Sequence, residues 1–242
     1  MFFPLMLVLS GLPALADDIG EEALKRVDAA LTAADEQVFH YELMTETPGM
    51  KPRAMEISVS MKGAKTLTEF HSPADLSGTK VLSLSRNQMY IYLPAYQKVR
   101  RIGSHVTGQG FMGTTYSHAE MSILEYSSSY TASLLEETEA QWTIELLPRP
   151  EVKVAHPRME MVIMKEMAQP TEIRYFNTKG ANTKTEVRRE FTCEGKVCNP
   201  EVMRMTDHTR NGAWTEFRRQ KWEAQPGLDE GLFTVRSLQS GS

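Results

Sequence analysis

The sequence has little cysteine and no excess of positive charge. Only two of its 242 residues are Cys, and 27 Lys and Arg stand against 31 Asp and Glu, which gives a formal net charge of −4. These numbers exclude a disulfide-dense small scaffold and argue against a nucleic-acid-binding protein, which normally shows a basic excess. Charged residues at 24% and hydrophobic residues at 41% are ordinary globular values, so wholesale disorder is excluded as well.

The sequence also lacks the common signatures of catalysis and metal binding. It contains no H-E-x-x-H, no G-x-S-x-G, no P-loop and no G-x-G-x-x-G after a strand. His118 with Glu120, or Asp207 with His208, could be drawn as acid–base pairs, but we expect surface or turn residues at all four positions. We therefore predict no catalytic residue, no metal site, no cofactor and no enzymatic activity.

Long apolar runs are absent beyond the N-terminus. The run Phe2–Leu15 ends in Ala14-Leu15-Ala16, the small-x-small pattern of a secretory cleavage site, although no Lys or Arg precedes it. We predict a signal peptide at residues 1–16; the alternative is a buried N-terminal strand or helix. No Cys follows the apolar run, so the lipobox that would attach the protein to a membrane by a lipid is absent. No later stretch approaches the ~18 apolar residues of a transmembrane helix. Residues 17–242 are expected to form a single, soluble, exported domain in the periplasm.

The two cysteines, Cys193 and Cys198, are separated by Glu-Gly-Lys-Val between two strand-like runs. A four-residue hairpin loop brings its flanking residues into cross-strand register, close enough for a disulfide. An oxidising compartment favours that bond, and the spacing does not fit a C-x-x-C redox motif. We predict a structural disulfide.

Hydrophobic periodicity predicts one helix followed by many strands. Residues 18–38 carry an i, i+3, i+4 apolar stripe, with Asp17 and Asp18 placed to cap the helix. From Arg53 onward the period becomes two, and about ten or eleven short strands at this spacing predict a large antiparallel sheet, a sandwich or a barrel. Residues 121–137 interrupt the run with loosely helical spacing. Both faces of several strands are partly apolar, which leaves two possibilities: a ligand-binding face or two packed layers.

Two further features allow either a purely structural or a functional interpretation. Short basic tracts at 98–101, 188–189 and 218–221 are expected to be solvated strand faces, or else a surface for an acidic or membrane partner. The Gly-rich loop 103–113 contains Phe111 and Met112, which suit contact with an apolar ligand if the loop is mobile.

Three segments in the middle of the chain carry a resemblance to a known family. They are 89–94 (Met-Tyr-Ile-Tyr-Leu-Pro), 98–102 (Lys-Val-Arg-Arg-Ile) and 111–117 (Phe-Met-Gly-Thr-Thr-Tyr-Ser). In order and spacing they resemble the outer-membrane lipoprotein-sorting proteins, relatives of the periplasmic carriers LolA and LolB. The opening helix around Leu24–Asp28 and the closing segment Gly231–Leu238 match in pattern. The chain departs from the family at 114–120, where family members usually carry acidic residues.

The resemblance implies a mainly β fold: an incomplete β-barrel built from a curved antiparallel sheet of about ten or eleven strands. An N-terminal helix and a mid-chain helical lid would cover its mouth, and its concave face would hold acyl chains. The implied function is that of a periplasmic carrier of lipoprotein or lipid acyl chains toward the outer membrane. An inner-membrane transporter would be the donor and an outer-membrane protein the acceptor. Such a cavity needs apolar lining and leaves little motif behind.

A ligand-sensing or regulatory module on the same fold, comparable to periplasmic regulators that bind an anti-sigma factor, is the alternative. A regulator usually carries an added partner-binding domain, for which the last predicted strand leaves no room, so the carrier is favoured. For the acyl cavity we select one face of the strand around Ile57, one residue of a second strand and the tip of the Gly-rich loop. The predicted lining residues are Met55, Ile57, Val59, Met61, Tyr92, Phe111 and Met112.

Overall fold

The structure is a computed structural model that describes residues 12–85, 88–103, 110–122 and 125–239. It consists of one α-helix, thirteen strands and four short 3-10 helices within these residues. In chain order they are α1 (Leu12–Leu31), β1 (Glu36–Glu46), β2 (Arg53–Lys62), β3 (Lys65–Ser72), β4 (Lys80–Ser85), β5 (Gln88–Leu93), η1 (Pro94–Tyr96), β6 (Lys98–Ile102), η3 (Glu120–Ser122), β7 (Tyr130–Glu137), β8 (Gln141–Pro148), β9 (Arg158–Met164), β10 (Gln169–Phe176), β11 (Asn182–Glu194), β12 (Val197–Asp207), η4 (His208–Arg210), β13 (Ala213–Ala224) and η5 (Glu230–Phe233).

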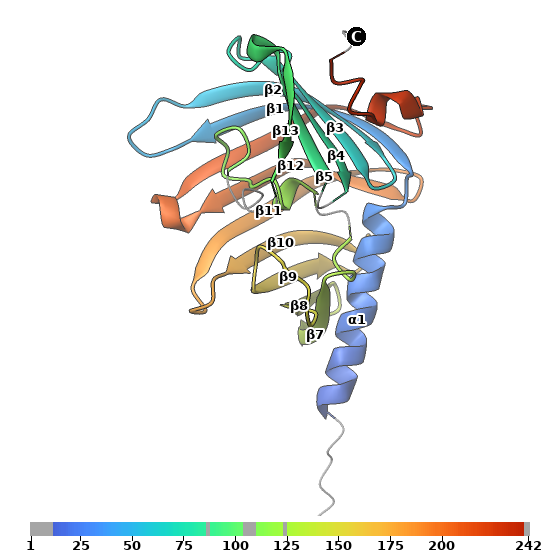
Figure 1. The fold of residues 1–242 in the computed structure, drawn as a ribbon. Coiled ribbons are helices and arrows are strands. Elements are labelled where there is room, and N and C mark those ends of the chain that lie inside the picture. The colour runs from blue at the N-terminus through green and yellow to red at the C-terminus, as the bar shows by residue number, and fades with distance from the viewer. Residues whose placement is uncertain (1–11, 86–87, 104–109, 123–124, 240–242) are drawn as a thin grey trace, which may run out of the picture.

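All thirteen strands belong to one antiparallel sheet. Its order is β6-β5-β4-β3-β2-β1-β13-β12-β11-β10-β9-β8-β7, so two meanders meet where β1 pairs with β13. The sheet is open, since β6 and β7 are its edges, and it curves around the concave side against which α1 lies (Figure 1). The expected curved antiparallel sheet is confirmed, but the expected ten or eleven strands fall short of the observed number.

One reason for the shortfall is the predicted mid-chain helix at 121–137, which is wrong. Only η3 is helical there among the described residues, and β7 occupies the second half of the segment. Tyr130 and Ala132 are buried while Thr131 and Ser133 are more exposed, so the true period is two. Loose spacing of large apolar residues fits both periods, which is why a helical lid was expected in this segment.

The N-terminal helix exists but begins and ends earlier than predicted. It starts at Leu12, so Asp17 and Asp18 lie inside it and not at its N-cap, and residues 36–38 belong to β1. The helix lies directly on edge strand β7: a Cβ at Gly20 would come within 2.6 Å of the Ser133 Cα. Glu21 Oε1 also accepts a hydrogen bond of 2.9 Å from the Ala132 amide of that strand. The helix thus covers a strand edge that would otherwise be open to pairing with another chain.

The main hydrophobic cluster fills the concave side of the sheet. It joins the buried face of α1 to inward side chains of strands from both meanders, including Phe39, Ile57, Ile144 and Met205. A second, smaller cluster lies on the opposite face, where Leu67 and Leu82 pack against the C-terminal Phe233 and Leu238.

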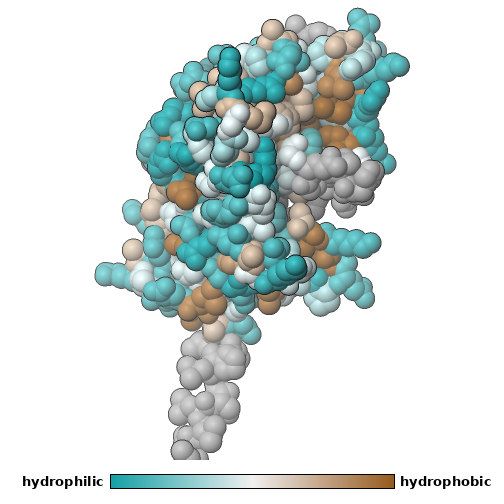
Figure 2. Space-filling model, turned by 90° about the vertical axis from the view of Figure 1, so that its left-hand side faces the viewer, coloured by the Kyte–Doolittle hydropathy of each residue, from teal (hydrophilic) through white to brown (hydrophobic). Residues whose placement is uncertain are grey.

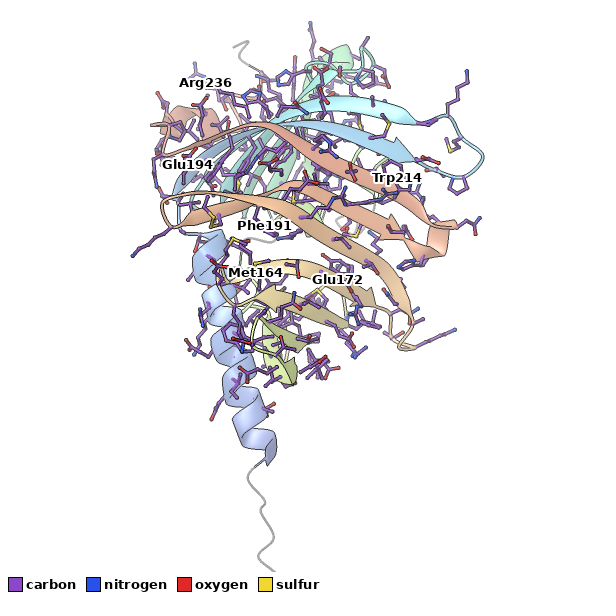
Figure 3. The ribbon with its side chains drawn as sticks, turned by 180° about the vertical axis from the view of Figure 1, so that it is seen from behind. Met164, Glu172, Phe191, Glu194, Trp214 and Arg236 are labelled. Carbon is purple, nitrogen blue, oxygen red and sulfur yellow. A yellow bond between two sulfur atoms is a disulfide. The ribbon has the colours of Figure 1, made fainter. Side chains whose placement is uncertain are left out.

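Other outward positions are largely polar. From behind, strands β9–β13 present their outer face, which includes Glu172 and Trp214 (Figure 3). Arg158, Glu160 and Arg174 form an ion-pair ladder on that face. On the face shown in Figure 2, apolar surface is broken into small patches separated by hydrophilic residues. None of the described helices is long and apolar enough to cross a membrane.

The predicted disulfide is present. Cys193 and Cys198 are bonded and lie directly opposite each other in the register of β11 and β12. Gly195 occupies the turn with φ +61°, a conformation that suits glycine. The bond closes the hairpin whose two strands form one wall of the cavity described below.

Candidate functional site

A cavity of about 160 Å³ opens on the concave side, beneath the junction of the two meanders. Its wall is built mainly from apolar and aromatic side chains, with a few polar groups contributed by several strands. The lining residues are Leu31, Gln37, Phe39, Tyr41, Val59, Met61, Thr66, Thr68, Met121, Arg188, Asn199, Pro200, Met203 and Phe217.

Strand alternation and register bring these residues together. Phe39 lies opposite Val59, and Gln37 opposite Met61, in the antiparallel pairing of β1 with β2. On the other side of β1, the Tyr41 ring meets Phe217 of β13 edge to face, with centroids 5.6 Å apart. Because inward positions recur every second residue, three neighbouring strands supply a continuous apolar floor.

The segment 110–122 lies across the concave face and closes one end of the cavity. The Thr115 amide donates a 2.9 Å hydrogen bond to Thr215 Oγ1, and the Thr115 hydroxyl donates one of 3.0 Å to the Met205 carbonyl. The Tyr116 ring packs edge to face on Phe217. Met121 of this segment reaches the cavity wall.

Charged side chains are buried on the same concave face, along β11. Lys184, Glu186 and Arg188 occupy alternate positions that point inward. Lys184 Nζ donates 2.9 Å hydrogen bonds to both oxygens of Glu120, whose side chain is only 1% exposed. Arg188 Nε bonds Glu186 Oε1 at 2.8 Å.

The Glu120 carboxylate is held ionised despite its burial. Burial alone would raise its pKa, but the His156 ring, with Nε2 at 3.0 Å from Oε1, and the Lys184 ammonium outweigh that effect and lower the pKa to about 2. The Ser117 amide adds a 2.6 Å hydrogen bond. This ionic cluster fastens the crossing segment to β11.

Comparisons with solved structures identify the fold. A domain described as an outer membrane lipoprotein-sorting protein from Vibrio parahaemolyticus matches with a TM-score of 0.85 at 22% identity, covering 93% of this chain and all of its own. A DUF1329 family protein from Desulfovibrio piger matches with a TM-score of 0.84 at 20% identity, covering 92% and 99%. A LolA superfamily protein from Nitrosomonas europaea gives 0.75 at 16% identity, covering 90% and 98%.

Sequence comparison adds a family. No curated protein matches the chain significantly. A protein-family model described as "Uncharacterized protein" matches residues 62–240, which is well over half of the chain. The chain belongs to this family, and its fold is LolA-like. The resemblance found in the sequence is thereby confirmed at the level of the fold.

The LolA-like fold places the four predicted residues of β2 on the concave face. Val59 and Met61 line the cavity itself. Met55 and Ile57 point to the same side but lie deeper, each 1% exposed within the main hydrophobic cluster. These four share a face, as alternation predicts, and two of them reach the hollow part.

The other three predicted residues lie elsewhere in the LolA-like fold. Tyr92 is on the opposite face, partly buried against the second cluster, because Ile91 and not Tyr92 pairs with inward Val81; its assignment to the β2 face is corrected by this register. Phe111 is 2% exposed and packs on Phe70 within the main hydrophobic cluster. Met112 packs partly buried against the main cluster.

Several residues of the cavity and of the adjoining ionic cluster could not be found from the sequence. Phe39 and Tyr41 alternate in a segment that the sequence predicts to be a strand. Their hydrophobic alternation is therefore visible in the sequence, but the pairing with neighbouring strands, which places them in the cavity, is not. Arg188 was expected on a solvated strand face, and Glu120 at the surface or in a turn; the structure buries both side chains. For Glu120 no local pattern indicates burial, since its partners Lys184 and His156 come from distant segments. Arg188 pairs with Glu186, two residues away on the same strand, but its inward position depends on the register of β11 with β12. No group of His, Cys, Asp and Glu suited to a metal ion occurs among the described residues.

Proposed function

We propose that the chain is a carrier that holds acyl chains of lipoproteins or lipids in its concave cavity for transfer toward the outer membrane. The observation that carries this proposal is the open, largely apolar cavity on the concave side of a LolA-like sheet. An acyl chain requires apolar walls and room, and few directional hydrogen bonds. The proposal assigns the chain no chemical reaction.

The proposal includes the cellular setting. Residues 1–16 act as a signal peptide, and the remaining chain works in the periplasm between an inner-membrane transporter as donor and an outer-membrane acceptor. The disulfide supports an oxidising compartment, because such bonds persist there and are rare in the cytosol. The matched domain from Vibrio parahaemolyticus, described as a lipoprotein-sorting protein, supports the cargo class.

A charge placed in the cavity wall tests the proposal. Met61 lines the cavity and is half-buried, so Met61→Asp should leave the fold intact while its carboxylate repels apolar cargo. We expect binding of a fluorescent fatty-acyl probe to weaken at least ~10-fold. The matched control is Ser60→Asp, one residue away on the other face of β2, which should bind as the wild type does.

The outcome is read together with circular dichroism. Unchanged probe binding by folded Met61→Asp would refute the cavity as the acyl site, as would an equal loss in Ser60→Asp. Ser58 is unsuitable as a control, because it is buried and lies 2.9 Å from His71 Nε2 in a hydrogen bond.

A further inference from the structure

The cavity wall contains one charged side chain among the described residues that line it, Arg188. Its neighbours in the same inward row are apolar: Met203 lies opposite it on β12, and Phe217 lies opposite Met203 on β13. The remaining polar lining is neutral. The Gln37 side-chain oxygen accepts hydrogen bonds from the Asn199 amide and the Trp222 indole. Arg188 is therefore a single cation at the border of an apolar surface.

Arg188 is fixed in place by a buried carboxylate. Its side chain is 13% exposed and that of Glu186 4%. Glu186 also accepts a 3.1 Å hydrogen bond from the Tyr175 hydroxyl. A buried ion pair of this kind returns little net stability, because both charges lose their hydration, and well-packed apolar residues are often more stabilising. Fold stability alone thus gives weak reason for an arginine at this wall, and ligand binding gives a stronger one.

The geometry of the pair leaves donors for a ligand. A guanidinium carries five N–H groups in a planar fork; the bond to Glu186 uses the one on Nε, and a further N–H donates to the Tyr126 hydroxyl. The remaining terminal N–H groups are suited to hydrogen bonds with a carboxylate or phosphate. An apolar wall with a cation at its border matches a molecule that has an apolar chain and one anionic end.

We propose that the cavity selects amphiphiles whose apolar chain ends in a carboxylate or phosphate, and that Arg188 binds the anionic group. This inference rests on the proposed acyl-binding function and narrows its ligand class. The fixed orientation given by Glu186 and Tyr175 positions the guanidinium before the ligand arrives, which lowers the entropic cost of binding.

The test compares three ligands with the same twelve-carbon chain: dodecanoate, monododecyl phosphate and 1-dodecanol. Calorimetric titration at low salt and below micellar concentrations should show the anions binding about tenfold more tightly than the alcohol, as expected for a charge-assisted hydrogen bond. The two anions distinguish a carboxylate from a phosphate preference. The double variant Glu186→Gln with Arg188→Met removes the charged pair together, so no lone charge stays buried. It should bind all three ligands with the affinity of the alcohol.

Arg189→Gln is the matched control, because Arg189 is adjacent on β11 but points to the outer face, where it pairs with Glu216. It should keep the wild-type preference. Equal binding of anions and alcohol by the wild type would overturn the inference without any variant and would leave the acyl-binding proposal standing. A preference retained by the folded double variant would also overturn it. If the wild type binds none of the three twelve-carbon ligands, both the acyl-binding proposal and the inference about Arg188 fail.

Discussion

Strands β2 and β11 lie on opposite sides of the cavity and use the same alternation in opposite ways. Strand β2 turns Met55, Ile57 and Val59 inward. Strand β11 turns Lys184, Glu186 and Arg188 inward and leaves Val187 37% exposed on the outer face. The concave side is therefore apolar on one flank and charged on the other. Alternation alone identifies two sets of side chains per strand, but partners across the sheet decide which set is inside.

Ile57→Asp should have the largest effect, because it puts an unpaired carboxylate into the apolar flank. Ile57 is 1% exposed and lies between Tyr41 and Phe70 on the neighbouring strands. We expect a loss of more than about 4 kcal/mol in the free energy of unfolding, or no folded protein. Urea denaturation followed by circular dichroism measures it. A native spectrum with an unchanged midpoint would show that this flank is wet and not a core.

Lowering the pH should have the second-largest effect, because it destabilises the charged flank. The folded pKa of Glu120 is about 2, below its ordinary 4.5, so its contribution is present above about pH 4.5 and is lost as pH falls toward 2. A shift of this size corresponds to on the order of 3 kcal/mol. The stability of the wild type should fall more between pH 5 and pH 3 than that of Glu120→Gln. Parallel pH profiles for the two proteins would contradict the assignment.

Ile57 and Glu120 also show which structural features can be predicted from the sequence and which cannot. The hydrophobic pattern of β2 is local, so its strand and its inward set follow from period two alone. Glu120 depends on Lys184 and His156, each from a distant strand or loop, and no local pattern encodes that meeting. Tyr92 illustrates the intermediate case: its strand is predictable, but both its faces are apolar, and only the C-terminal Phe233 and Leu238 explain which one is outside.

The disulfide sharpens the comparison because β11 has it and β2 does not. Cys193 and Cys198 lie in direct register, so the bond supports the pairing that turns Arg188 inward. Cys193→Ser with Cys198→Ser should cost about 2 kcal/mol by the loop-entropy estimate for so short a loop. Folding itself should persist, since the rest of the hairpin remains paired. Urea midpoints compared with and without reductant measure the effect. Two free thiols in folded protein produced in an oxidising compartment and purified without reductant would refute the bond.

Val187→Asp should have the smallest effect and tests the inversion of β11 directly. Chemically the change resembles Ile57→Asp, a β-branched apolar residue replaced by a carboxylate in mid-strand. Val187 is 37% exposed on the outer face and lies opposite Glu172 and Arg204 of the flanking strands. The new carboxylate stays hydrated, so the free energy of unfolding should change by less than about 0.5 kcal/mol. A loss comparable to that of Ile57→Asp would mean that Val187 is covered in solution, and that this outer face packs against another surface.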